Sequence, residues 1–386
     1  MSFKKSALIG AALLILNSSA DAAAVAGQDD WQDLQETNLS EENPVEVHGK
    51  IKFARNILHA PQNYPAPFGE TKNSAEIYLN ANFFLARDFY LKSRLQGERI
   101  WAKSSTDSKL KFKQLYLEKN FGVVQVRGGK IPVFDALNLT SGGVVIDSEI
   151  IGGQIKIPVG TWKILATGGV IDNDDYSLTR TTTIFDTDSK FFALQANGDF
   201  NKNISAAVGV FNIHNNANGL TLPSGAAYSP GGKGFFESGT EKNNTVFSAG
   251  LDYKFSEKFA LGGIYSVGSA KITQQAQNNA RENPSEDNGF SIQFTYGQPQ
   301  IKKKNNFSAW LAYRKLGRTG TYNPAFKGVG FGEQGLEIGA RYNVFENVSL
   351  ETIYFNGKKI SKLAPPAPDA DKPKIHKFYF SVNYEF

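Results

Sequence analysis

The sequence predicts an all-β fold, a sixteen-stranded antiparallel transmembrane β-barrel with short turns at one end and long loops at the other. Apolar and polar residues alternate with a period of two in segments of roughly 8 to 13 residues, as in strands with two unlike faces. The connections between these segments alternate between a few residues and long polar stretches, which is typical of membrane barrels. The chain of 386 residues has no cysteine, so its stability comes from a source other than disulfides.

Residues 1–22 have the features of a secretory signal peptide. Lys4 and Lys5 precede an apolar run from about Ala7 to Leu16, and small residues follow. The run is too short for a membrane-spanning helix. We expect cleavage after Ala22, with Ala26 as the alternative, and therefore an exported chain.

The exported chain divides into a short leader and one large domain. Residues 23–44 are acidic and polar, which favours a loosely structured leader, and residues 45–386 form the barrel. Its strands are expected near residues 45–57, 74–86, 89–101, 110–121, 123–130, 149–158, 162–170, 190–200, 204–214, 245–255, 259–271, 289–297, 307–314, 335–345, 348–355 and 377–386.

The connections sort by length. The even-numbered ones, such as Arg87-Asp88 and Glu346-Asn347, are tiny, and only 298–306 is longer. The odd-numbered ones are mostly long and polar. An even number of strands with short periplasmic turns and long extracellular loops is the organisation of an outer-membrane barrel.

Each strand is expected to alternate lipid-facing and lumen-facing residues. In 245–255, for example, Phe247 and Leu251 lie opposite Ser248 and Asp252. Sixteen strands enclose an interior too wide for their side chains to fill, so the polar faces line water. A girdle of aromatic residues is predicted at the short-turn end: Phe84, Phe89, Phe121, Trp162, Phe200, Phe255, Phe259, Phe345 and Phe386.

The segment 110–121 breaks this alternation, because Lys111 and Lys113 share parity with Leu115 and Leu117. Two explanations stay open. The strand contains a β-bulge, or its upper half rises above the membrane.

The signal peptide, the loop pattern and the aromatic last strand, 377–386, resemble bacterial outer-membrane general porins, and the layout is similar to the porins of diderm Firmicutes. The resemblance implies an outer-membrane channel for passive diffusion of small hydrophilic solutes and ions, without a cofactor. It also implies a homotrimer in contact with membrane lipid and lipopolysaccharide. A terminal aromatic strand, here with Tyr384 and Phe386, implies recognition by the barrel assembly machinery.

The same resemblance implies that the third long loop, 131–149, folds into the pore. Asp135 lies on this loop. Basic residues with lumen parity occur on the strands before it: Lys50, Lys52, Lys92, Arg94 and Arg127. Opposed charges across a constriction would create a transverse field, and we expect a mild anion preference. The alternative is that these are ordinary solvated charges of the lumen.

The sequence also leaves other functions open. The alternatives are a porin selective for a sugar or an anion, and a barrel that tethers the membrane or adheres to a host. No serine stands in a recognisable nucleophile motif, so we do not expect an enzyme. Gly330, Gly332 and Gly335 match a nucleotide-binding pattern but lead into a strand rather than a helix. The four histidines are far apart in sequence, and the charges are too interspersed for nucleic-acid binding.

Overall fold

The structure, a computed structural model, describes residues 43–59, 71–102, 106–136, 138–171, 190–214, 243–270, 273–276, 279–282, 287–297, 303–317, 319–322, 326–330, 332–360 and 374–386. The predicted signal peptide, 1–22, lies outside these ranges, as do residues 23–42 of the leader. In the described part of the chain, no helix is long and apolar enough to cross a membrane.

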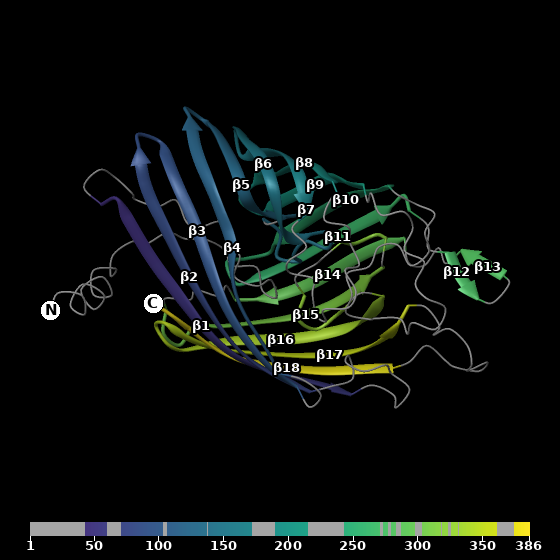
Figure 1. The fold of residues 1–386 in the computed structure, drawn as a ribbon. Coiled ribbons are helices and arrows are strands. Elements are labelled where there is room, and N and C mark those ends of the chain that lie inside the picture. The colour runs from purple at the N-terminus through teal and green to yellow at the C-terminus, as the bar shows by residue number, and fades with distance from the viewer. Residues whose placement is uncertain are drawn as a thin grey trace.

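Sixteen antiparallel strands form one closed barrel (Figure 1), which confirms the predicted fold class. Each strand pairs with its neighbours in sequence, and β11 pairs with β14 across a long connection. The barrel strands are β1 (Val45–His59), β2 (Lys72–Ala86), β3 (Phe89–Ala102), β4 (Thr106–Phe121), β5 (Val124–Phe134), β6 (Asp147–Val159), β7 (Trp162–Ile171), β8 (Lys190–Asn201), β9 (Ile204–His214), β10 (Asn243–Lys254), β11 (Phe259–Gly268), β14 (Asn288–Tyr296), β15 (Phe307–Leu316), β16 (Glu333–Phe345), β17 (Val348–Lys359) and β18 (Lys374–Glu385).

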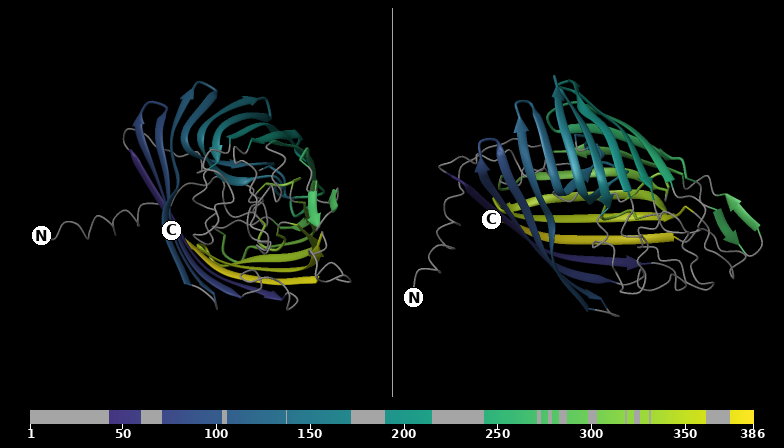
Figure 2. Two further views of the ribbon diagram at one scale, coloured as in Figure 1. Left: turned by 45° about the vertical axis from the view of Figure 1, so that its right-hand side comes forward. Right: turned by 45° about the horizontal axis from the view of Figure 1, so that its top comes forward.

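A second, two-stranded sheet of β12 (Thr273–Ala276) and β13 (Asn279–Glu282) was not expected from the sequence. It belongs to the connection between β11 and β14. Figure 2 shows it beyond the ring of barrel strands. Its residues lack the apolar alternation by which the barrel strands were predicted.

The last strand closes the barrel against the first. β18 pairs with β1 from Lys50↔Glu385 to His59↔His376. At the end of the chain the Gly49 N–H donates to the Phe386 carbonyl over 2.7 Å, and the Phe386 N–H donates to the Gly49 carbonyl over 2.9 Å. The Phe386 ring lies over Gly49, where a side chain would collide with it. The prediction that 377–386 pairs with the first strand is therefore confirmed.

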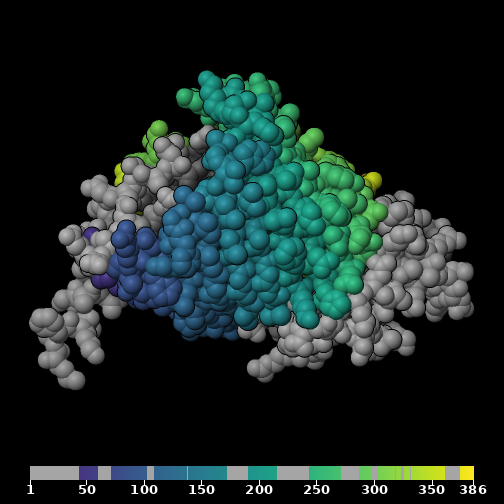
Figure 3. Space-filling model, turned by 90° about the horizontal axis from the view of Figure 1, so that it is seen from above, coloured from purple at the N-terminus to yellow at the C-terminus, as the bar shows by residue number. Residues whose placement is uncertain are grey.

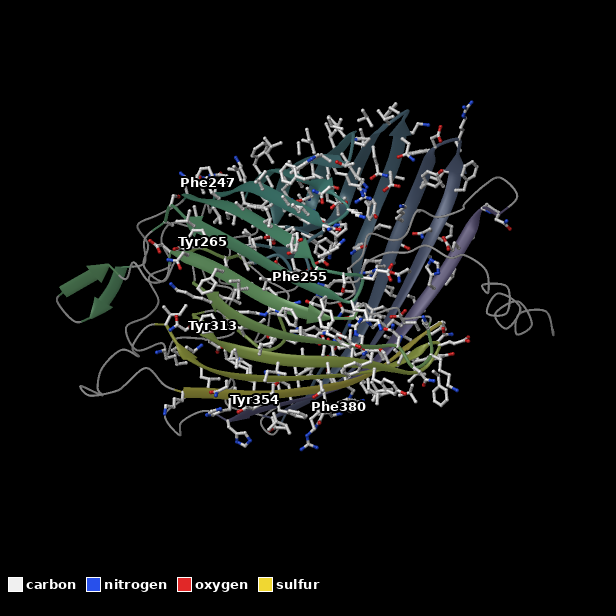
Figure 4. The ribbon with its side chains drawn as sticks, turned by 180° about the vertical axis from the view of Figure 1, so that it is seen from behind. Phe247, Phe255, Tyr265, Tyr313, Tyr354 and Phe380 are labelled. Atoms are coloured by element: carbon white, nitrogen blue, oxygen red, sulfur yellow. The ribbon has the colours of Figure 1, made fainter. Side chains whose placement is uncertain are left out.

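The outer surface carries the predicted apolar residues. Phe53 on β1 is 58% exposed. Large apolar side chains at the outward positions of β10 and β16 are exposed as well. Figure 4 labels aromatic examples on several strands around the barrel, and in Figure 3 the side chains of β6 to β11 cover one side of the barrel. At the short-turn end, exposed aromatic rings recur as the girdle predicts: Phe121, Phe200, Phe255, Phe259, Phe345 and Phe386.

A β-bulge resolves the irregular alternation of β4. Arg94 of β3 pairs with Gln114 but the next residue, Leu95, pairs with Phe112, so Lys113 is the extra residue. One extra residue exchanges the two faces of a strand. Leu115 therefore faces outward on one side of the bulge and Phe112 on the other, which confirms the first of the two explanations.

Three glycine doublets lie side by side in β5, β6 and β7. Gly128 and Gly153 are paired, and so are their neighbours Gly129 and Gly152. On β7, Gly169 pairs with Gly152. A Cβ on Gly152 would lie 2.1 Å from the Gly168 carbonyl oxygen, whereas a Cβ on Gly153 would meet its nearest atom at 3.6 Å. The backbones approach at Gly152 more closely than any other residue would allow.

We therefore predict that Gly152→Ala destabilises the barrel by about 1–3 kcal/mol, because the added methyl group forces the β6 and β7 backbones apart. Gly153→Ala is the matched control, since its methyl group makes only an ordinary van der Waals contact. The measurement is the urea midpoint of unfolding of the refolded protein in detergent. Equal midpoints for the two variants would contradict this account of the glycine doublets.

Candidate pore and its constriction

The register places the five predicted basic residues on the lumen side of neighbouring strands. Lys52 of β1 pairs with Glu76 of β2, and Lys92 and Arg94 of β3 pair with Asn82 and Asn80. Arg127 of β5 is opposite Glu118 of β4. The strand order β1, β2, β3, β4, β5 thus collects these cations on one side of the lumen.

Carboxylates accompany these cations. The Lys52 Nζ lies 3.0 Å from a Glu76 carboxylate oxygen. Glu118 lies between two cations, 2.9 Å from the Lys92 Nζ and 2.8 Å from the Arg127 Nε. Such pairing offsets the cost of removing each charge from bulk water.

Two further contacts complete this side. Arg94 donates through Nε to Asn80 over 2.5 Å, and the Lys50 Nζ is 3.9 Å from the Glu385 carboxylate. The five cations therefore form a basic wall whose charge is partly neutralised, and we refer to these residues as the basic wall.

Asp135 is separated from the basic wall by its own loop. Its carboxylate is buried and accepts hydrogen bonds from the backbone N–H groups of Val144, Val145 and Ile146 at 2.8–3.1 Å. These bonds join the two ends of the connection between β5 and β6. Burial raises the pKa of the Asp135 carboxyl to about 6, and the backbone donors oppose that rise.

The connection 135–146, which we term the first inner loop, reaches the opposite wall. Gln293 of β14 donates to the Thr140 carbonyl over 2.6 Å, and the Thr140 N–H donates to Asp252 of β10. Asn138 donates to the Ala206 carbonyl of β9 over 2.9 Å. The loop is thus hydrogen-bonded to the wall opposite its own strands.

Arg314 of β15 is the centre of this docking. It is fully buried, and its guanidinium donates to the Ser141 carbonyl over 3.0 Å and to the Ser291 Oγ over 2.6 Å. The same guanidinium also donates to the Gln293 side-chain carbonyl over 2.5 Å and to the Glu337 carboxylate over 3.2 Å. Because a buried guanidinium needs all these acceptors, it fixes the loop backbone at Ser141.

The described residues of a second connection, 317–332, also lie inside the barrel, and we term them the second inner loop. The Tyr322 N–H donates to the Val145 carbonyl of the first inner loop over 2.6 Å. The Phe326 ring lies 3.9 Å from the Arg314 guanidinium carbon. The Lys327 Nζ lies 2.7 Å from the Glu351 carboxylate of β17. The two loops therefore support each other inside the barrel.

The second inner loop was not predicted from the sequence. Its glycines at 317, 320, 328, 330 and 332 and its apolar residues Tyr322, Phe326 and Val329 were the available signal, because most of the other long connections are polar. The glycines that matched the nucleotide-binding pattern belong to this loop and to the start of β16.

The two inner loops cover one side of the lumen. Lumen-facing side chains such as Gln195, Asp252 and Ser291, on β8, β10 and β14, are buried. On the other side Lys92 and Arg94 of β3 are buried as well. Partly exposed lumen positions remain on β1 and β2, at His48 and Tyr78. In the described residues, no group of three or more histidine, aspartate or glutamate side chains is arranged to hold a metal ion.

Comparisons with known proteins agree with this architecture. Residues 241–384, from the end of the connection before β10 into β18, match a family described as "putative porin". No match was found among curated protein sequences.

Solved structures of the porin of Rhodopseudomonas blastica share the fold. One engineered variant is 11% identical, with a TM-score of 0.51, and the alignment covers 89% of this chain and 100% of that one. A second variant is 10% identical, with a TM-score of 0.50 over the same shares. The predicted resemblance to bacterial porins is thus confirmed, by the family match for the C-terminal part and by the fold for the barrel.

Asp135→Asn tests how the first inner loop is held. An amide presents one acceptor oxygen where the carboxylate presents two, so a buried N–H loses its partner and we expect a loss of about 1–3 kcal/mol. In single-channel recordings the loosened loop should produce noisier currents. Asp88→Asn, in the exposed turn after β2, is the control. Steady currents and an unchanged unfolding midpoint for Asp135→Asn would contradict the bonding described here.

Proposed function

We propose that the chain is a porin of the bacterial outer membrane, which forms a water-filled channel for the passive diffusion of small hydrophilic solutes and ions. One observation carries the proposal: sixteen strands close into a barrel with apolar residues outside and charged residues inside. Side chains of the wall cannot fill a barrel of this strand number. The family match of residues 241–384 supports the same function.

The basic wall is proposed as one side of the constriction. Lys50, Lys52, Lys92, Arg94 and Arg127 belong to strands on one side of the lumen, and Glu76, Glu118 and Glu385 neutralise part of their charge. A partly compensated basic wall favours anions mildly. Asp135 contributes indirectly, because it holds the first inner loop opposite this wall.

A channel selective for one class of solute is the second candidate. Its support is the presence of two inner loops rather than one, which narrows the path. A general channel keeps its conductance as sugars or organic anions are added. A selective one is blocked by its substrate in a saturable way, and a titration of single-channel current distinguishes the two.

Outer-membrane location and assembly are part of the proposal. We propose that residues 1–22 direct export, that the barrel assembly machinery recognises the last strand through Tyr384 and Phe386, and that the barrels associate as homotrimers. The support is that both rings lie exposed at the closing strand and stack on each other, with centroids 5.8 Å apart. The tether or adhesin alternative rests on the leader and the long loops, and most of these residues lie outside the described ranges.

Charge removal from the basic wall should change ion selectivity. Lys50→Gln combined with Arg94→Gln is expected to shift the zero-current potential in a salt gradient toward cations, since two positive charges leave the lumen wall. Lys202→Gln, in the exposed turn between β8 and β9, should leave it unchanged. Clear cation selectivity of the unmodified channel would refute the proposed anion preference.

Phe386→Ser should lower the amount of barrel inserted in the outer membrane several-fold while the inserted channels conduct normally. The physical reason is the loss of the terminal ring that the assembly machinery is proposed to recognise. Phe345→Ser is the control, because that ring is also exposed near the short turns but is not terminal. Equal insertion of both variants would count against an assembly signal.

A further inference from the structure

One carboxylate of the lumen wall has no partner in the protein. Among the lumen-facing aspartate and glutamate side chains that the structure describes, Glu98 of β3 is the one that accepts no hydrogen bond and joins no ion pair. Its side chain is partly exposed, whereas Lys92 and Arg94 on the same face of β3 are buried. Solvent therefore reaches the Glu98 carboxylate.

The register places Glu98 in a row of charged residues on four neighbouring strands. Glu98 is directly opposite Lys109 of β4 on one side and Glu76 of β2 on the other. Glu76 in turn is opposite Lys52 of β1. The row thus reads cation, carboxylate, carboxylate, cation. Like charges directly opposite each other on paired strands destabilise a sheet, so the pair of carboxylates is costly for the fold.

The two carboxylates of this row are bonded unequally. The Lys52 Nζ lies 3.0 Å from a Glu76 carboxylate oxygen, and two hydroxyl groups of β2 donate to the same carboxylate. The charges of Lys109 and Lys111 act on Glu98, but neither ammonium is in ion-pair contact with it. A cationic group of a solute would therefore find Glu98 available and Glu76 already bonded.

The β-bulge of β4 brings two lysines beside Glu98. Because Lys113 is the extra residue, Lys109 and Lys111 lie on the lumen face, opposite Glu98 and Gln96, and the residues between them face outward. Both lysine side chains are partly exposed. Both also make other contacts within the barrel. An ammonium group has three donors, so it can donate to one further oxygen atom.

These residues lie on the loop side of the basic wall. β3 runs from the short turn after β2 towards the long loops, and Glu98 follows Lys92 and Arg94 along it. A solute that enters from the loop side therefore meets Glu98 before it meets Arg94 and Lys92.

Charges of both signs at one partly exposed place favour a solute that carries both. A simple anion is repelled by Glu76 and Glu98, and a simple cation is repelled by the lysines of β1 and β4. A zwitterion directs its ammonium group at Glu98 and its carboxylate at Lys109 and Lys111. Both ends then form charge-assisted hydrogen bonds, which are stronger than neutral ones.

We propose that Glu98, Lys109 and Lys111 form a subsite for zwitterionic solutes of the α-amino acid class, with Glu98 as the residue that determines this specificity. The inference rests on the proposed channel function and names a class of solute that the channel favours.

The test measures how fast L-glutamine and arabinose enter liposomes that contain the refolded full-length barrel. Arabinose is an uncharged sugar of similar size, and neither solute has a net charge at neutral pH. The variants are Glu98→Gln, the charge-preserving Glu98→Asp, and Glu346→Gln in the exposed turn between β16 and β17 as the control. Heat-dependent gel mobility verifies that each barrel is folded. Glu98→Gln should fold normally, since it removes one of two opposed like charges.

We expect glutamine to enter through the unmodified barrel faster than arabinose. Glu98→Gln should lower the ratio of glutamine to arabinose entry by roughly threefold, as for the loss of one partly exposed ion pair. Glu98→Asp should keep most of the ratio and Glu346→Gln all of it. Arabinose entry should be the same in every variant, which a merely structural role of Glu98 would not predict.

A second readout identifies the charge of the solute. In single-channel recordings, glutamine should reduce the salt current in a saturable way, and methylammonium or acetate at the same concentration should not. An unchanged entry ratio in Glu98→Gln would overturn the inference. Block by methylammonium as strong as block by glutamine would also overturn it, because Glu98 would then be a site for simple cations.

Arabinose entry separates this inference from the proposed function. Normal arabinose entry with an unchanged glutamine ratio in Glu98→Gln would contradict the subsite alone. Absence of arabinose entry through the unmodified, folded barrel would contradict the proposed channel.

Discussion

The structure depends on one constraint, that every backbone N–H and C=O in the membrane must have a hydrogen-bond partner within the barrel. Closure between β18 and β1 satisfies this for the two strands that would otherwise be edges. The exchange of hydrogen bonds between Gly49 and Phe386 extends the closure to the last residue. The ladder between β4 and β5 ends early, at Leu115↔Lys130.

Closure of sixteen strands creates the second physical problem, a lumen wider than its wall side chains can fill. The two inner loops narrow the lumen by docking on one side of it. Arg314 ties the first loop to the β14–β16 wall, and Tyr322 and Phe326 support it from the second loop. The lumen positions that stay partly exposed, such as His48 and Tyr78, lie on β1 and β2. The width of the channel is therefore set by loop docking, and its charge by β1–β5.

The barrel could be predicted from the sequence because the residues of each strand alternate between an apolar and a polar face. Alternation in 245–255 or 335–345 is a local signal, and a parity conflict such as that of Lys113 shows an irregularity of the strand without any knowledge of its partner strand. Only the register with β3 identifies it as a bulge. The terminal strand was recognisable for the same reason, since Phe386 continues an outward face that begins at Phe378.

The inner parts could not be predicted because they depend on contacts between residues far apart in sequence. The Asp135 carboxylate is held by three N–H groups of its own loop. Nothing in its local sequence distinguishes a carboxylate that holds a loop from one that faces the pore. Arg314 and Ser141 are separated by 173 positions. The ladder between β4 and β5 ends at Leu115↔Lys130. The periodicity within these two strands does not indicate where their pairing stops.

The central claim is an off-axis aqueous path beside β1 and β2, with the opposite wall covered by loops. Because the chain has no cysteine, single cysteines test it directly. His48→Cys lies on the open side and Ser291→Cys under the first inner loop. A charged thiol reagent, added during single-channel recording, should reduce the current of His48→Cys and leave Ser291→Cys unmodified. Rapid block of Ser291→Cys, with His48→Cys unaffected, would contradict the account.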